Sequence, residues 1–277
     1  STPALWPLAV IYFWLFAAVG ALLPFLPQYL AERGFGPVDL GLLLASMAVV
    51  KVLAPTAWAY VADRTGARVA VIRAGIGGAI VCVAALMGDF GFWWLVVVLA
   101  LHGLFSTAIL PQVETVTLAR LGAGAKQYGR IRLWGSVGFV AAVVATGWLT
   151  ETFGLSLLPV VVIGCQVVAL LATALLADPD DIGHSAQAAP LGPVIRQAHV
   201  VVFLFVAMLM AASHAPYYSF FSIQLGDLGY SRTTIGILWA FAVVAEVILF
   251  SQGGWLLARF TLVRLLGAAL AVTALRW

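Results

Sequence analysis

Charged side chains are scarce in this sequence, and their scarcity excludes a water-soluble globular protein. Of the 277 residues, 9% are charged and 64% are hydrophobic, and the mean hydropathy is +1.09. Soluble domains carry about 25% charged residues, which cover the surface that faces water. The composition therefore predicts an integral membrane protein.

Cysteine and the usual signatures of catalysis are rare or missing as well. The two cysteines, Cys82 and Cys165, each lie inside an apolar run, where a thiol packs as a small residue. The sequence has no His-Glu-x-x-His, no Gly-x-Ser-x-Gly and no ATP-binding motif. We therefore expect no disulfide framework, metal or cofactor, and an enzyme embedded in the membrane is disfavoured.

Long apolar runs are what the sequence does have. They reach about 20 residues or more, which is the length a helix needs to cross roughly 30 Å of hydrocarbon, whereas barrel strands need only about 10. We predict an all-α membrane protein. The expected spans are residues 4–30, 39–62, 69–88, 90–113, 132–150, 152–177, 198–226 and 233–258, with a ninth beginning at 265.

The polar stretch 178–197 divides the chain into two parts. It contains Asp178, Asp180 and Asp181 together with prolines, and no apolar run long enough to span a membrane. We expect an N-terminal six-helix half at 1–177, a cytoplasmic linker at 178–197 and an incomplete C-terminal half at 198–277. The sequence starts at a Ser and stops inside an apolar run, so we interpret it as a fragment.

An internal repeat supports two related halves. Residues 34–64 match residues 229–259 after a shift of 195, with seven identities in 31 positions and no gap. In this alignment Gly41 falls on Gly236, and Lys51 falls on Glu246, so one charge within a span replaces another. We expect Lys51 and Glu246 to occupy equivalent places about a two-fold axis, and Gly41 to pack near a neighbouring helix.

The distribution of Lys and Arg predicts the orientation. One side of the membrane receives most of them, whereas the other receives only Arg33 and Arg232 beside several carboxylates. Cytoplasmic loops are enriched in Lys and Arg. The N-terminus is therefore expected in the cytoplasm, and the net charge of +3 reflects topology rather than a nucleic-acid surface.

Several ionisable residues lie within the spans or near their ends: Lys51, Glu114, Glu246 and Arg276, with Arg132 entering the fifth span one turn after Tyr128. A charge at bilayer depth costs at least ~2.5 kcal/mol, so such residues usually face a wet cavity or a partner. A structural ion pair is the alternative for any one of them. As a group they favour a transport pathway.

Arg132 offers a planar fork that suits a carboxylate, and Glu114 is its nearest candidate counter-ion. Ser136 and Phe139 follow Arg132 by one and two turns on the same face. On the seventh span His214, Tyr217 and Tyr218 provide a titratable ring and two hydroxyls for a proton relay or for substrate hydrogen bonds, although ordinary helix packing explains His214 equally well. His102, alone on the fourth span, is interpreted as structural.

The turn Asp63-Arg64-Thr65-Gly66-Ala67-Arg68 resembles the signature loop of the major facilitator superfamily. Gly66 permits a tight turn, and the charges of Asp63, Arg64 and Arg68 can pair or bond helix ends. The resemblance implies a gating loop. This chain departs from the pattern at Ala59 and Ala67, where the superfamily has Gly and Arg.

Three further stretches resemble the phenylpropionate permease family, which is related to sugar-proton symporters of the lactose permease type. They are Tyr128-Gly-Arg-Ile-Arg-Leu-Trp-Gly-Ser-Val-Gly138, Ser213-His-Ala-Pro-Tyr-Tyr-Ser-Phe220 and Trp239-Ala-Phe-Ala-Val-Val-Ala-Glu-Val-Ile248. The resemblance implies the major facilitator fold with twelve helices. It also implies a clamp of Glu114 and Arg132, a stacking role for Phe139, site roles for Glu246 and Arg276, and a basic residue at Lys51.

We therefore expect a secondary transporter that moves a small organic solute, an aromatic or other organic acid, with protons by alternating access. Its partners would be the solute, protons and the lipid bilayer of a bacterial inner membrane, with no nucleic acid, and it would be a monomer. A sugar or nucleoside symporter and a non-transporting receptor on the same fold remain alternatives.

Overall fold

The computed structural model describes residues 5–122, 127–178 and 196–276, and it confirms the all-α prediction for them. Eight helices in these ranges are long and apolar enough to cross a membrane. The helices are α1 (Trp6–Glu32), α2 (Pro37–Thr65), α3 (Arg68–Ala85), α4 (Phe92–Leu121), α5 (Tyr128–Phe153), α6 (Leu158–Ala172) between η2 (Leu155–Leu157) and η3 (Thr173–Leu175), α8 (Ala198–Asp227), α9 (Arg232–Ser251), α10 (Gly253–Arg259) and α11 (Leu262–Arg276).

The eighth predicted span is interrupted, contrary to our expectation of one helix at 233–258. Helix α9 ends at Ser251, and α10 begins at Gly253 after Gln252. Consecutive glycines follow Gln252 in the sequence, and a glycine inside a helix costs about 1 kcal/mol relative to alanine. Apolar composition continues through the break, so hydropathy alone gave no sign of it.

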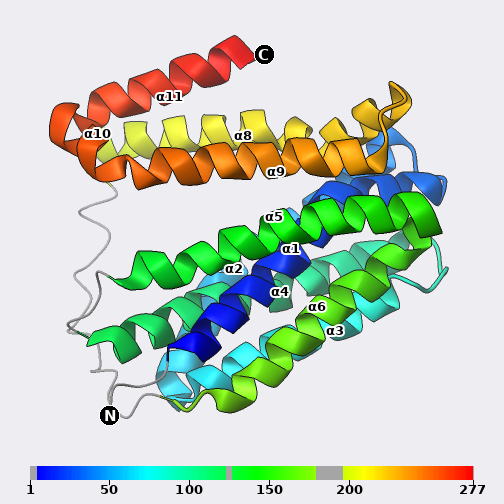
Figure 1. Ribbon diagram of the computed structural model, residues 1–277, viewed down its shortest axis with the longest axis horizontal. Helices are drawn as coiled ribbons and strands as arrows, with labels where there is room; N and C mark the ends of the chain where they lie inside the picture. Colours follow the sequence, from blue (N-terminus) through cyan, green and yellow to red (C-terminus); the bar gives the residue numbers. More distant parts are fainter. Residues whose placement is uncertain (1–4, 123–126, 179–195, 277) are drawn as a thin grey trace.

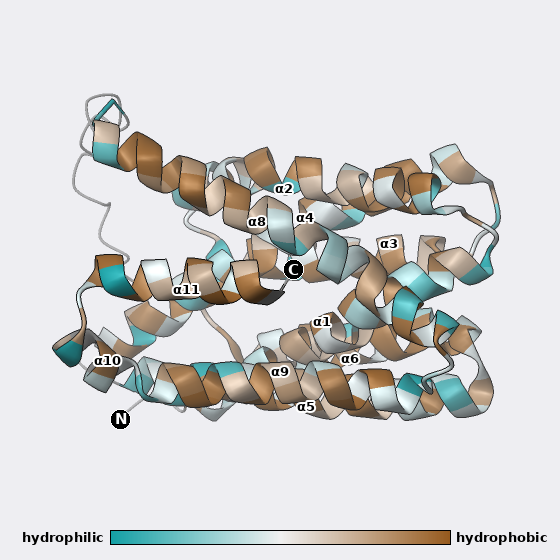
Figure 2. Cartoon of the chain, turned by 90° about the horizontal axis from the view of Figure 1, so that it is seen from above, coloured by the Kyte–Doolittle hydropathy of each residue, from teal (hydrophilic) through white to brown (hydrophobic). Residues whose placement is uncertain are grey.

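Helices α1 to α6 pack into one bundle (Figure 1). Within it α1 packs on α5 and α6, α3 joins α6 to α4, and α4 packs on α2. Helix α9 lies along α5 and α8 contacts α1, so these two helices cover one side of the bundle. Hydrophobic residues dominate the long helices, and hydrophilic ones gather mainly toward helix ends and loops (Figure 2). The predicted linker falls mostly on residues 179–195, which lie outside the described ranges.

Glycines allow several of these helices to touch backbone to backbone. A Cβ at Gly138 of α5 would lie 2.1 Å from the Phe13 carbonyl oxygen of α1, and one at Gly236 of α9 would lie 2.6 Å from the Val143 carbonyl oxygen of α5. Small residues permit this close approach in membrane helices. Gly41 was predicted to pack in the same way, but nothing lies within 4 Å of its Cβ position, because no described helix covers that face of α2.

The bundle and the α8–α9 pair are joined at one end, which we call the acidic end: the end at which α1 and α5 finish and α9 begins. Here the Gln28 side-chain amide donates to the Ser222 carbonyl at 2.6 Å, and Arg232 donates to the Thr150 carbonyl at 2.9 Å. Arg232 also pairs with Glu32. No hydrogen bond between described residues joins the two groups at the opposite, basic end, where α1 and α5 begin.

A carboxylate caps the start of α9 at the same end. Glu151 of α5 accepts a hydrogen bond from the Thr233 backbone N–H at 3.0 Å and a second from its hydroxyl. An anion at a helix N-terminus satisfies a free N–H and interacts favourably with the helix dipole. The acidic end is therefore closed by a set of polar contacts made from both helix groups.

Candidate functional site

Arg132 is held by aromatic side chains of a different helix. Its guanidinium carbon lies 4.0 Å from the ring centroid of Phe16 and 5.8 Å from that of Tyr12, both on α1. A guanidinium stacks well on aromatic faces, and the contact orients its plane. The half-buried Arg132 therefore presents a pre-oriented fork of N–H donors.

Glu114 of α4 bonds to the start of α5 rather than to Arg132. Its carboxylate accepts a hydrogen bond of 3.0 Å from the Tyr128 hydroxyl. The three ion pairs found between described residues are Arg33–Asp89, Arg68–Asp63 and Arg232–Glu32, so the predicted clamp of Glu114 and Arg132 is not closed by direct contact. Tyr128 precedes Arg132 by one turn of the same helix, so the Glu114 carboxylate is bonded to the turn that precedes Arg132.

Tyr12, Phe16 and Tyr128 belong to this cluster and were not among the residues predicted from the sequence. The Tyr12 side chain is fully buried, and its hydroxyl makes no hydrogen bond in the described part of the chain, although Thr117 and Tyr128 are its polar neighbours. A buried, unpartnered hydroxyl costs about 1–3 kcal/mol. Tyr128 opens the family-like motif and could have been found there, whereas Tyr12 and Phe16 look like packing residues of an apolar span.

The two residues predicted beyond Arg132 have different surroundings. Ser136 is half-buried on α5. Phe139 is 7% exposed and belongs to the main hydrophobic core, with its backbone oxygen 2.6 Å from the Cβ position of Gly20. The Phe139 ring is buried in this core, and its role as a stacking platform stays a prediction.

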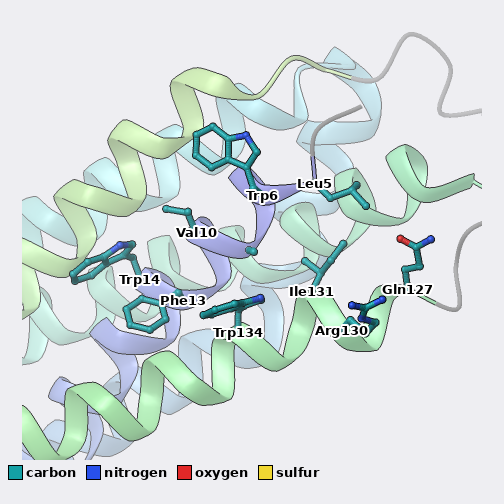
Figure 3. Close-up of a pocket in the computed structure, with 10 residues that line it drawn as sticks. Leu5, Trp6, Val10, Phe13, Trp14, Gln127, Arg130, Ile131 and Trp134 are labelled. Carbon is teal, nitrogen blue, oxygen red and sulfur yellow. The ribbon is translucent and has the colours of Figure 1, made fainter. Parts of the chain in front are cut away.

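A cavity of about 500 Å³ lies between the first turns of α1 and α5 (Figure 3), and Arg130, rather than Arg132, is its cationic lining residue. Its lining residues lie at the starts of α1 and α5 and in the residue before each helix. They are Leu5, Trp6, Ala9, Val10, Phe13 and Trp14 at α1, and Gln127, Arg130, Ile131 and Trp134 at α5. Four of these residues are aromatic and one is a cation. Ligand pockets have volumes of about 300–1,000 Å³ and combine apolar walls with a few polar groups, so the cavity is suited to a small aromatic anion.

The predicted residues of α8 join an aromatic cluster with α9. The rings of Tyr217 and Tyr218 lie 5.1 and 5.8 Å from that of Trp239, and Trp239 donates to the Ser222 hydroxyl at 3.0 Å. The His214 Nδ1 lies 2.8 Å from the Met210 carbonyl oxygen in its own helix. That bond satisfies one ring nitrogen locally, so a relay role for His214 stays a prediction.

The remaining predicted charges are separate from the Arg132 cluster. Lys51 on α2 and Glu246 on α9 are both exposed, and neither forms an ion pair among the described residues. Arg276 ends α11, but its side chain lies outside the described part. The structure therefore brings Arg132, Glu114 and Ser136 onto two neighbouring helices and leaves Lys51 and Glu246 unpaired.

The predicted gating loop forms a compact turn between α2 and α3. Arg68 binds the Asp63 carboxylate at 2.5 Å and donates to the Gln112 side chain of α4 at 2.8 Å. Gly66 caps α2 in the left-handed conformation, with a φ of 68°. Asp63, Gly66 and Arg68 thus fix the turn and tie it to α4, and the gating function stays a prediction.

We expect Gly66→Ala to destabilise the protein by roughly 1 kcal/mol, because an L side chain is strained at this positive φ. Thermal unfolding in detergent measures the effect. Gly77→Ala is the matched control, since Gly77 lies within α3 with nothing within 4 Å of its Cβ position. A lower melting temperature for the control than for Gly66→Ala would contradict this reading of the turn.

Comparison with known proteins places this arrangement in a family. The profile of the MFS_1 like family matches residues 5–277. The chain belongs to this family. It is 31% identical over 287 residues to the maltose permease of Geobacillus stearothermophilus, covering 97% of this chain and 68% of the permease. It is also 29% identical over 284 residues to the "Probable 3-phenylpropionic acid transporter" of Escherichia coli K12, covering 98% of this chain and 72% of that protein.

The fold is also found in solved structures. The crystal structure of the nucleoside transporter NupG superposes with a TM-score of 0.74 at 16% identity, covering 92% of this chain and 68% of that chain. At this identity the likeness shows the fold alone, and the fold is that of the major facilitator transporters. The MFS_1 like protein is therefore a multi-pass membrane transporter rather than an enzyme, and it resembles the phenylpropionate permease.

Proposed function

We propose that this family member is a secondary active transporter that carries a small aromatic or other organic acid by proton symport. The solute, protons and the bilayer are its partners, and it works as a monomer without nucleic acid. We place it in a bacterial inner membrane with the basic end and the N-terminus on the cytoplasmic side, as the bias of Lys and Arg predicts.

The observation that carries this proposal is the stacked guanidinium of Arg132. Stacking on Phe16 at 4.0 Å orients the fork, and a planar fork can bind a carboxylate through two parallel hydrogen bonds. The adjacent cavity is lined by Trp6, Trp14 and Trp134, whose rings suit an aromatic group. A carboxylate near Arg132 with an aromatic ring in this cavity describes the class of solute that the related phenylpropionic acid transporter is named for.

Alternating access is supported by the one-sided contact between the helix groups. Their hydrogen bonds lie at the acidic end, through Arg232, Glu151 and Gln28. Rigid rocking of two halves about a midplane site opens one end while the other closes. The contacts support a state closed at the acidic end, and the opposite state requires that they break.

A sugar or nucleoside is the second candidate solute. The Glu114 carboxylate is half-buried and bonded only to Tyr128 among the described residues, so it can also accept bonds from the hydroxyls of a polar ligand. The maltose permease is a relative and a nucleoside transporter shares the fold. A receptor that binds without transport is a third candidate.

Uptake into proteoliposomes under an imposed pH gradient tests the proposal. Labelled 3-phenylpropionate should accumulate when the outside is acidic, and a protonophore should abolish the accumulation. Labelled maltose and uridine, measured in parallel, should enter no faster than into empty liposomes. Uptake of maltose or uridine instead would favour the second candidate, and binding without uptake of any solute would favour a receptor.

A further inference from the structure

His102 is a buried ionisable residue of the α1–α6 bundle to which the site described above gives no role. It lies on α4 with 6% of its surface exposed. Neither ring nitrogen has a hydrogen-bond partner in the described part of the chain. A buried polar group without a partner costs about 1–3 kcal/mol, and such groups call for a functional explanation.

The packing of α2 on α4 leaves His102 little freedom to find a partner. A Cβ at Gly103 would lie 2.6 Å from the Met47 carbonyl oxygen, and the Trp58 indole N–H donates to the Leu104 carbonyl at 2.8 Å. These two contacts lie on either side of Lys51 in α2. Lys51 therefore lies near the level of His102 on the neighbouring helix.

The other ionisable groups named on the helices packed against α4 are bonded elsewhere, packed in the core or placed at helix ends. On α3, Arg73 binds the Thr173 carbonyl at 2.8 Å, Arg68 binds Asp63 and Gln112, and Cys82 packs in the hydrophobic core. On α5, Arg132 stacks on Phe16 and Tyr12. On α2, Asp39 lies in the first turn and Arg64 in the last. On α4 itself Glu114 accepts from Tyr128 and Arg120 donates to the Ala177 carbonyl. Among the described residues Lys51 is thus the charged residue without a bonded partner that lies near the level of His102.

We propose that His102 is the proton-binding residue of the transport cycle, and that Lys51 controls its protonation. This assignment rests on the proposed function for its role in symport. With Lys51 charged, a second cation at His102 is repelled, because the apolar surroundings of the buried imidazole screen charges poorly. The imidazole then stays neutral.

An organic anion bound at Arg132 changes the charge of the bundle. Lys51 makes no contact with the Arg132 cluster in the ranges that the structure describes, so the added negative charge acts on His102 through the apolar interior, where charges are poorly screened. It offsets the field of Lys51, and the imidazole takes a proton from water. The site then holds one added negative charge and one added proton, so no net charge is loaded. When the solute leaves, repulsion by Lys51 returns the proton to water on the side to which the site is open.

Nitrogen NMR of histidine-labelled protein tests the control by Lys51 without any solute. The His102 signal is assigned by its loss in His102→Gln. In Lys51→Gln we expect the fraction of His102 in the imidazolium form at pH 6 to rise about tenfold relative to the unsubstituted protein. An unchanged fraction would overturn the proposal. Lys51→Gln keeps His102 in place, so this test does not depend on how well His102→Gln folds.

Proton uptake on solute binding tests the role in symport. Adding 3-phenylpropionate to the purified protein in weak buffer should take up about one proton per bound solute, as followed by a pH dye. His102→Gln should lower this uptake at least tenfold at a solute concentration that saturates both proteins, where equilibrium dialysis should give equal bound solute. Its affinity for the solute should fall, because coupling between the two sites is reciprocal. His199→Gln is the matched control, because His199 is exposed at the start of α8.

The two measurements separate the two proposals. Full proton uptake by a folded His102→Gln protein would remove His102 as the proton site, and so would an unchanged solute affinity in that variant. Solute binding without proton uptake by the unsubstituted protein would refute proton symport itself. The NMR fraction would still decide whether Lys51 controls the protonation of His102.

Discussion

Replacing Arg132 with Lys should lower solute uptake roughly a hundredfold while the protein stays inserted and folded. The positive charge survives this change, but the planar group that stacks 4.0 Å over Phe16 does not. An ammonium has no fork for a carboxylate and no plane to lie on an aromatic ring, so the solute would be held loosely. Initial rates of uptake into proteoliposomes, at equal amounts of inserted protein, measure the effect.

Arg196→Lys is the matched control, since Arg196 is exposed before α8 and outside the site. A companion variant, Glu114→Gln, should also damage uptake, because it weakens the acceptor of the Tyr128 hydroxyl and leaves Arg132 without a nearby negative charge. Normal uptake in both Arg132→Lys and Glu114→Gln would remove the pair from the site. The predicted solute-binding role would then pass to Lys51, Glu246 and Arg276.

Replacing Gly236 with Trp should abolish uptake by holding the acidic end open. A single added carbon at Gly236 would already lie 2.6 Å from the Val143 carbonyl oxygen, so an indole cannot fit while α9 stays against α5. The polar contacts of Arg232 and Thr233 with α5 would be lost at the same time. The variant would be trapped in the state that is open at the acidic end.

Cysteine labelling distinguishes this trapped state from misfolding. In a background without Cys82 and Cys165, Ser136→Cys should react with an impermeant thiol reagent from the basic side in the parent protein. Adding Gly236→Trp should shift the reaction to the acidic side. Gly164→Trp is the control, since Gly164 of α6 is exposed and nothing lies within 4 Å of its Cβ position. Unchanged sidedness, or uptake near the parent rate, would contradict the prediction.

The sequence alone determined the membrane character and the course of most helices. Hydropathy is a local property, so apolar runs located the eight long helices to within a few residues at most ends. Hydropathy did not predict the break at Gln252, where α9 ends inside an apolar run just before two consecutive glycines. The turn at Gly66 was predicted because left-handed backbone is a property of the glycine itself.

The site was predicted only in part. Charges inside apolar runs are costly wherever they occur, and this singled out Arg132, Glu114 and Lys51 from composition and position. Their partners were not predictable in the same way. Phe16 and Tyr12 precede Arg132 by more than 100 residues, and contacts at such separation depend on how two helices cross.

Only the tertiary structure decided those crossings, because they are set by close packing at particular glycines. The close approach of Gly138 to the Phe13 backbone brings α5 against α1 within two turns of Arg132. The close approach of Gly103 to the Met47 backbone brings α4 against α2 at the residue next to His102. The sequence showed His102 as a lone histidine in an apolar helix, and we interpreted it as structural. Neither ring nitrogen of His102 has a hydrogen-bond partner among the described residues, and Lys51 lies near its level on α2. Both facts follow from the register of α2 against α4, so they are visible only once the two helices are packed.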